Sequence, residues 1–192
     1  MPTNPTSGIA QSHKIGLSNL HVAKITKDDS TGVTYDTVLH IPEIVSLSIE
    51  PQNQTAELYG DNMSIDVANS TPSYNVTIEL AGLPLEYKAY LLGHTFADGK
   101  ISVSSDDVAP FIGIAFETLK SNGTKRYFKF LKVKFAEPNE QNETKGENIN
   151  FQTSSLEGKA VFRTYDAKVY EQADEESGFA DAASWYLFPA LP

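Results

Sequence analysis

The residues that could do chemistry are dispersed along this chain. Its four histidines, His13, His21, His40 and His94, are far apart, and none stands at the spacing of a metal site. Disulfides and thiolate chemistry are excluded because the chain has no cysteine. We find no nucleophile elbow, phosphate-binding loop, zinc-protease helix or calcium loop. The sequence therefore predicts no catalytic residue, no metal site and no cofactor.

Carboxylates occur in segments with the composition of turns. They are Asp28 and Asp29, Asp61, Asp66, and Asp106 and Asp107. Gathered at loop ends, they could hold a hard cation or serve a hydrolase, but solubility and turn formation explain them better. Asp106 or Asp107 could also accept local backbone hydrogen bonds before Pro110.

Length and charge limit the classes of function. The 192 residues suit one domain, which we divide into an arm (1–13), a β domain (14–170) and a C-terminal arm (171–192). The net charge of −10 argues against binding DNA through its phosphates. No apolar run is long enough to span a bilayer, and Met1–Gly8 do not resemble a secretory signal, so we expect no membrane partner and synthesis in the cytoplasm.

The elements that position these residues are predicted to be mainly strands. Period-two patterns and turn residues predict a β-sandwich or partly closed β-barrel with one short helix, Pro84 to Leu92. The strands are expected at Leu17–Ile25, Thr34–His40, Val45–Glu50, Tyr74–Leu80, Ile101–Val103, Phe111–Leu119, Arg126–Phe135 and Leu156–Tyr165. From Pro51 to Pro72 the chain is polar and irregular, which predicts a long inter-strand loop.

The segment from Asp106 to Phe128 is the most informative. Asn122-Gly123 between two apolar runs predicts a hairpin with a tight turn. The buried phase changes near Phe130, which predicts a β-bulge or a change of buried face.

The second of these strands also carries the one concentrated basic stretch. It comprises Lys125, Arg126, Lys129, Lys132 and Lys134. The stretch could be a solvated face or guarded edge, or it could contact an acidic neighbouring subunit.

The C-terminal arm contains the single tryptophan. Trp185, Tyr186 and Phe188 follow an acidic cluster that begins at Asp174. These rings either fold back on their own core or dock on another subunit, and chain order leaves both open.

Several short stretches, taken in order, carry a family resemblance from about Lys14 to about Tyr170. They are Lys14–His21, Ala81–Glu86, Asp106–Phe116, Ser121–Phe128, Thr144–Glu147 and Phe151–Thr153. Together they resemble the major tail protein of long non-contractile-tailed phages. The resemblance implies a structural virion protein whose hexameric rings stack into the tube that conducts DNA. It also implies a tape measure protein and tail tip or terminator proteins as partners.

The segment Pro51 to Pro72 occupies the place of the family's long loop. We therefore expect Leu58, Tyr59 and Met63, apolar residues in a polar segment, to make ring-stacking contacts, with the alternative that they pack on their own domain. The net charge suggests an acidic lumen or, equally, ordinary solubility. Another function class is a carbohydrate-binding β-sandwich with Tyr59, Tyr74 or Trp185 as the stacking platform.

Overall fold

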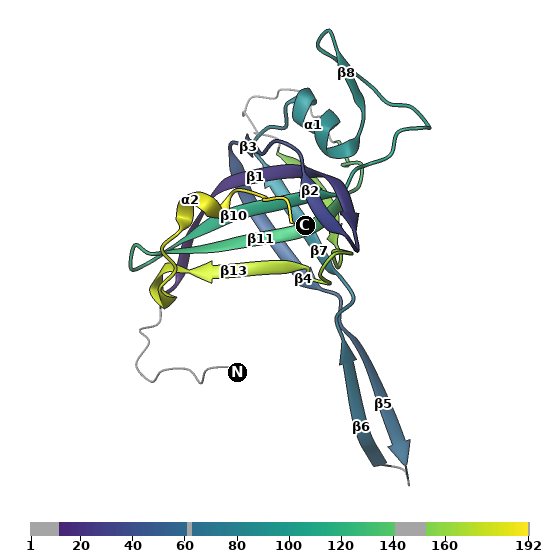
Figure 1. Ribbon diagram of the computed structural model, residues 1–192, viewed down its shortest axis with the longest axis vertical. Coiled ribbons are helices and arrows are strands. Elements are labelled where there is room, and N and C mark those ends of the chain that lie inside the picture. The colour runs from purple at the N-terminus through teal and green to yellow at the C-terminus, as the bar shows by residue number, and fades with distance from the viewer. Residues whose placement is uncertain (1–11, 61–62, 141–152, 192) are drawn as a thin grey trace, which may run out of the picture.

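Thirteen strands dominate the computed structural model, which describes residues 12–60, 63–140 and 153–191 (Figure 1). They are β1 (Lys14–Asp29), β2 (Gly32–Tyr35), β3 (Leu39–Ile41), β4 (Ile44–Pro51), β5 (Gln54–Gly60), β6 (Met63–Ser70), β7 (Tyr74–Leu80), β8 (Thr95–Ala97), β9 (Lys100–Ser102), β10 (Ile112–Lys120), β11 (Lys125–Phe135), β12 (Ser154–Ala160) and β13 (Tyr170–Asp174). The helices are α1 (Leu85–Leu92), the 3₁₀ helix η1 (Glu175–Ser177) and α2 (Ala182–Trp185). The prediction of a mainly β fold is confirmed.

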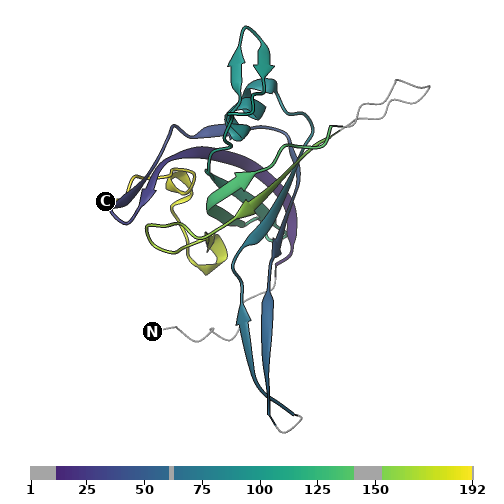
Figure 2. The same ribbon diagram turned by 90° about the vertical axis from the view of Figure 1, so that its right-hand side faces the viewer.

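Nine strands form one antiparallel sheet. Its order is β2-β1-β10-β11-β12-β7-β4, with β13 paired to β11 and β3 paired to β1. Within the described residues β2 and β4 do not pair, so the sheet curves around the core without closing into a barrel (Figures 1 and 2). This arrangement is consistent with the predicted sandwich or partly closed barrel.

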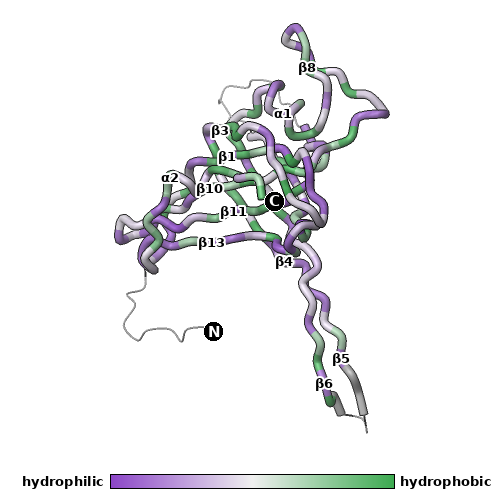
Figure 3. Tube along the Cα trace, in the orientation of Figure 1, coloured by the Kyte–Doolittle hydropathy of each residue, from purple (hydrophilic) through white to green (hydrophobic). Residues whose placement is uncertain are grey.

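The core lies inside this curved sheet. It contains buried residues of β1, β7 and β10 to β12, and Phe116 stacks on Phe128 with the ring centroids 5.0 Å apart. Figure 3 shows hydrophobic residues along β10 and β11, where the sheet is buried on both faces. A strand covered on both sides needs apolar residues at odd and even positions.

The predicted hairpin and its bulge are both present. Gly123 adopts a φ of 83°, which glycine tolerates, and Thr124 donates its backbone N–H to Asn122 Oδ1 at 3.1 Å. Ile114 pairs with Phe130, but Ile112 pairs with Val133, so β11 contains additional residues at this point. This bulge explains the change of apolar phase near Phe130.

Helix α1 is also confirmed. Pro84 precedes its first residue, and Gly93 ends it with a φ of 78°. A residue with a side chain would be strained at that φ, so glycine suits this helix end.

Three sequence predictions are corrected. The segment Pro51 to Pro72 is a regular β-hairpin of β5 and β6 rather than an irregular loop. The predicted strand Thr34–His40 is two strands, β2 and β3, because residues 36–38 leave the sheet. The predicted strand Leu156–Tyr165 ends at Ala160, where a turn leads to β13.

Residues 170–191, which we call the C-terminal strap, cover the outer face of β1, β10 and β11 (Figure 1). β13 extends the sheet beside β11, and Trp185 and Phe188 pack over Ala23 and Ala115. Small residues on the sheet leave space for these rings. Most of the predicted arm 1–13 lies outside the described residues, and the division into domain and arms remains a prediction.

Candidate assembly surfaces

The β5–β6 hairpin projects from the body beyond β4 and β7 (Figures 1 and 2). Its strands pair from Gln54 opposite Ser70 to Gly60 opposite Met63. Side-chain hydrogen bonds fasten the end nearest the body: Thr55 Oγ1 donates to Asn69 Oδ1 at 2.9 Å, and Thr71 Oγ1 donates to Asn53 Oδ1 at 2.7 Å. A two-stranded ribbon is marginally stable in water by itself, so a partner surface would stabilise it.

Two apolar side chains are exposed on this hairpin. Ile65 is 67% exposed and Val67 is 51% exposed, and because they are two residues apart on β6 they share one face. Exposed apolar patches on soluble proteins mark sites of interaction. Sequence reasoning missed both residues, although the alternation Ile65-x-Val67 was a signal for them.

The loop residues expected to make ring-stacking contacts belong to this hairpin. Leu58 and Tyr59 lie in β5, where they pair with Asp66 and Ser64, and Met63 begins β6. Their side chains lie outside the described part of the chain. Their role in assembly therefore stays a prediction.

The sheet itself offers a second kind of surface at β4. Within the described residues β4 pairs with β7 alone, so its second edge carries no strand. Ser46, Ser48 and Glu50 are exposed there, as is Val45, which is 52% exposed. Backbone groups on such an edge can pair with a strand of another chain.

A third surface lies at the other end of the long axis (Figure 1). We call residues 85–108, which include α1 and the β8–β9 hairpin, the knob. It exposes Phe96, Val103 and Val108. His94, at the end of α1, lies 2.8 Å from Asp107 and 2.9 Å from Glu137, and these hydrogen bonds raise the pKa of the imidazole.

The aromatic residues of the strap contact their own chain. Trp185 donates its Nε1–H to Phe128 O at 3.3 Å, Phe188 is buried, and Tyr186 donates its hydroxyl to Glu117. The sequence left open whether these rings fold back on their own core or dock on another subunit. The described contacts are those of rings that fold back on their own sheet. A role of Trp185, Tyr186 and Phe188 in self-assembly stays a prediction, and the buried face of Trp185 does not offer a platform for sugar.

The comparison with protein families identifies the family of this chain. The model of the phage tail tube protein family matches residues 10–184. The chain belongs to this family. It is therefore a structural component of a phage tail, as the sequence resemblance implied, and membership implies assembly with other tail components.

The other comparisons add little. Among solved structures, this tail tube protein is similar to a chain in the cryo-electron microscopy structure of the anti-feeding prophage baseplate, 6-fold symmetrised. The two share 10% identity with a TM-score of 0.39, and the similarity covers 90% of this chain and 97% of the other. No curated protein matches the sequence. In the described residues of the tail tube protein, no helix is long and apolar enough to cross a membrane.

Three of the five residues in the basic stretch of this tail tube protein are paired within the chain, and a contact of the stretch with an acidic neighbouring subunit stays a prediction. Lys125 pairs with Glu117 at 2.8 Å, Arg126 with Asp174 at 2.7 Å, and Lys132 with Asp28 at 2.6 Å. Because β11 lies inside the sheet, these residues do not guard an edge. Asp174 and Asp28 are distant in sequence from their partners, so no local pattern could reveal these two pairs.

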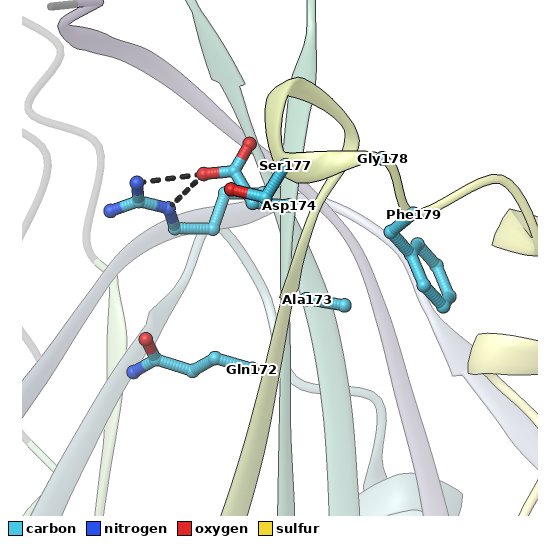
Figure 4. Close-up of a pocket in the computed structure, with 7 residues that line it drawn as sticks. Gln172, Ala173, Asp174, Ser177, Gly178 and Phe179 are labelled. Atoms are coloured by element: carbon cyan, nitrogen blue, oxygen red, sulfur yellow. Dashed lines mark hydrogen bonds and ion pairs between the residues drawn. The ribbon is translucent and has the colours of Figure 1, made fainter. Parts of the chain in front are cut away.

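An open depression beside β13 shows one of these pairs (Figure 4). Gln172 and Asp174 extend from one side of β13 and Ala173 from the other. The guanidinium of Arg126 binds Asp174 through Nε and Nη2, both at 2.7 Å. These charges satisfy each other, and no group of metal-ligating residues occurs within the described residues. Within the described residues β13 pairs with β11 alone, and in the tail tube protein the depression is best explained as the second edge of β13.

Proposed function

We propose that copies of this chain assemble into hexameric rings that stack to form the tail tube of a long non-contractile-tailed phage. The tube would conduct DNA during ejection. The observation that carries the proposal is the projecting β5–β6 hairpin, because it exposes Ile65 and Val67 away from the body.

Two features favour repeated contacts between copies. The hairpin and the unpaired edge of β4 are two different surfaces of the described chain. If either surface of one copy binds a different surface of the next copy, the contact is head-to-tail. Such contacts either close into rings or grow into filaments. A stack of rings requires both outcomes: closure within a ring and growth between rings.

The experiment compares two substitutions that add the same charge to the same face of β6. Val67→Asp places a carboxylate in the apolar patch, whereas Asn69→Asp adds one beside it and keeps an acceptor for Thr55. Both positions are exposed, so each change should alter the free energy of unfolding by about 0.5 kcal/mol or less.

We expect Val67→Asp to raise the protein concentration needed for tubes by about tenfold or more, because burying a charge in an interface costs more than 1.4 kcal/mol. Asn69→Asp should form tubes like the wild type. Negative-stain electron microscopy of both variants over a concentration series gives the answer. Equal tube formation by wild type and Val67→Asp would refute a role for this face.

The remaining parts of the proposal concern the lumen and the partners. A net charge of −10 favours a wall that does not retain DNA. Inside the tube we propose a tape measure protein, and at its ends tail tip and terminator proteins. A map of the assembled tube tests the lumen directly, since a positive inner wall would contradict the acidic lumen.

A further inference from the structure

A cavity with an excess of positive charge lies between β11, the turn after β12 and the end of the C-terminal strap. Its volume is about 250 Å³. The lining contains three cationic side chains, those of Lys129, Arg163 and Lys168, and one carboxylate, that of Glu171. Asp166 pairs with Arg163 and adds a second carboxylate beside the three cations, so one positive charge remains in excess.

Lys129 is the unusual member of the lining because, within the described residues, it is buried without an ion pair. The residue is 7% exposed, and its ammonium donates to Leu187 O at 2.8 Å. The rings of Trp185 and Phe188 lie 4.9 and 5.1 Å from Nζ. An ammonium has three N–H donors, and the described residues supply one acceptor and two ring faces.

The carboxylate of the lining is engaged with another lysine. Glu171 pairs with Lys129 in the strand register, but its Oε1 accepts from Lys168 Nζ at 3.0 Å. Burial lowers the pKa of Lys129, as expected for a cation in an apolar site. A buried charge is costly unless it is paired, so this ammonium would gain from an anionic partner.

Arg163 provides a second cation of fixed position. It is 4% exposed, and its guanidinium is held by Asp166 and by Tyr35 Oη, which lies 3.1 Å from Nη1. The lining also contains the apolar side chains of Phe188 and Leu191, both of the strap. Fixed cations beside apolar side chains form a small site in which charge-assisted hydrogen bonds are strong.

We propose that this cavity binds a small oxyanion of the phosphate or carboxylate class, with the Lys129 ammonium as its principal donor. The anion accepts N–H groups that the protein leaves without an acceptor, and it balances the excess charge. Because the strap forms one wall, the bound anion also fastens the strap to the sheet.

Trp185 makes the proposal measurable, since it is the single tryptophan and its ring lies 4.9 Å from Lys129 Nζ. The full chain is titrated with sodium phosphate and, separately, with sodium acetate at constant ionic strength, and tryptophan fluorescence is recorded. We expect a saturable change with at least one anion. Tighter binding of phosphate or of acetate identifies the preferred anion geometry.

Three variants test the site. Lys129→Met should weaken binding by about tenfold or more, because it removes a charged donor. Lys168→Met, at a side chain that is 56% exposed, should also weaken binding and does not alter a buried position. Lys134→Met, an exposed lysine of the same strand, should bind like the wild type.

Two results would overturn the proposal. One is the absence of saturation with either anion. The other is unchanged affinity in Lys168→Met, a variant that remains informative even if Lys129→Met does not fold.

Discussion

At the scale of single residues, His94 gives a prediction about pH. Both of its nitrogens face carboxylates, Asp107 and Glu137, and both can donate only when the ring is protonated. The imidazolium therefore fastens the end of α1 to the loop of Asp107 and to the chain after β11. Lys88 reinforces this contact through Glu137 and Glu140.

The raised pKa of His94 sets the direction of the effect. Its contribution to stability is fully present below the ordinary histidine value of about 6.5 and is lost as the pH rises through the raised pKa. The lowered pKa values of Asp107 and Glu137 have the opposite effect, since their contribution is lost in acid.

We expect the difference in free energy of unfolding between wild type and His94→Asn to shrink as the pH rises from the ordinary histidine value of about 6.5 through the raised pKa of His94. Urea titrations at each pH measure it. His13→Asn, at an exposed histidine, is the control and should show no such trend. A constant difference for His94→Asn would contradict the contact.

Lys120 gives a second prediction at this scale. It is 2% exposed, and its ammonium binds Asp174 at 2.6 Å and Glu176 at 2.7 Å, so it joins the end of β10 to the strap. Lys120→Met should lower the free energy of unfolding by about 3 kcal/mol, because Asp174 and Glu176 lose a buried cationic partner, although Asp174 keeps its pair with Arg126. Lys27→Met removes an exposed pair with Asp29 and should change it by less than about 1 kcal/mol. Similar urea midpoints for the two variants would contradict the difference in burial.

At the scale of elements, the packing of the strap on the sheet depends on Gly113. A Cβ added there would lie 2.5 Å from the ring of Phe188 and 2.9 Å from that of Tyr35. Gly113→Ala should displace Phe188 and cost about 1–3 kcal/mol. Gly82→Ala is the control, since nothing lies within 4 Å of its added Cβ. Thermal unfolding and the emission of Trp185 should change in the first variant alone.

Some elements of the fold could be predicted from the sequence and others could not. Strands with one buried face, such as β7, and the bulge of β11 leave a periodic apolar pattern, and the Asn122-Gly123 turn has its own signature. The β5–β6 hairpin left only the short alternation Ile65-x-Val67, because its described side chains are exposed on both faces and a longer apolar alternation marks burial. The pairs of Lys120 with Asp174 and Lys132 with Asp28 join residues far apart in sequence, so only the folded chain reveals them.

At the scale of the whole molecule, net charge should govern association. Copies that each carry −10 repel one another, and salt screens this repulsion. Raising the salt from about 0.1 M to about 1 M shortens the Debye length from about 10 Å to about 3 Å, so tubes should form faster and at lower protein concentration. Light scattering during assembly measures this. Slower assembly at high salt would instead indicate attraction between opposite charges across the interface.

The long axis of the molecule ends in the β5–β6 hairpin on one side and the knob on the other (Figure 1). Both ends expose apolar side chains, among them Ile65 on the hairpin and Val103 on the knob. Chains stacked along this axis would bring such surfaces into contact and remove them from water.

Cryo-electron microscopy of the purified chain at increasing concentration tests the central claim most directly. The account predicts hollow tubes of stacked six-membered rings in which the β5–β6 hairpin crosses from one ring to the next. A chain that stays monomeric at every concentration, and also after addition of tail tips that could initiate assembly, would contradict it.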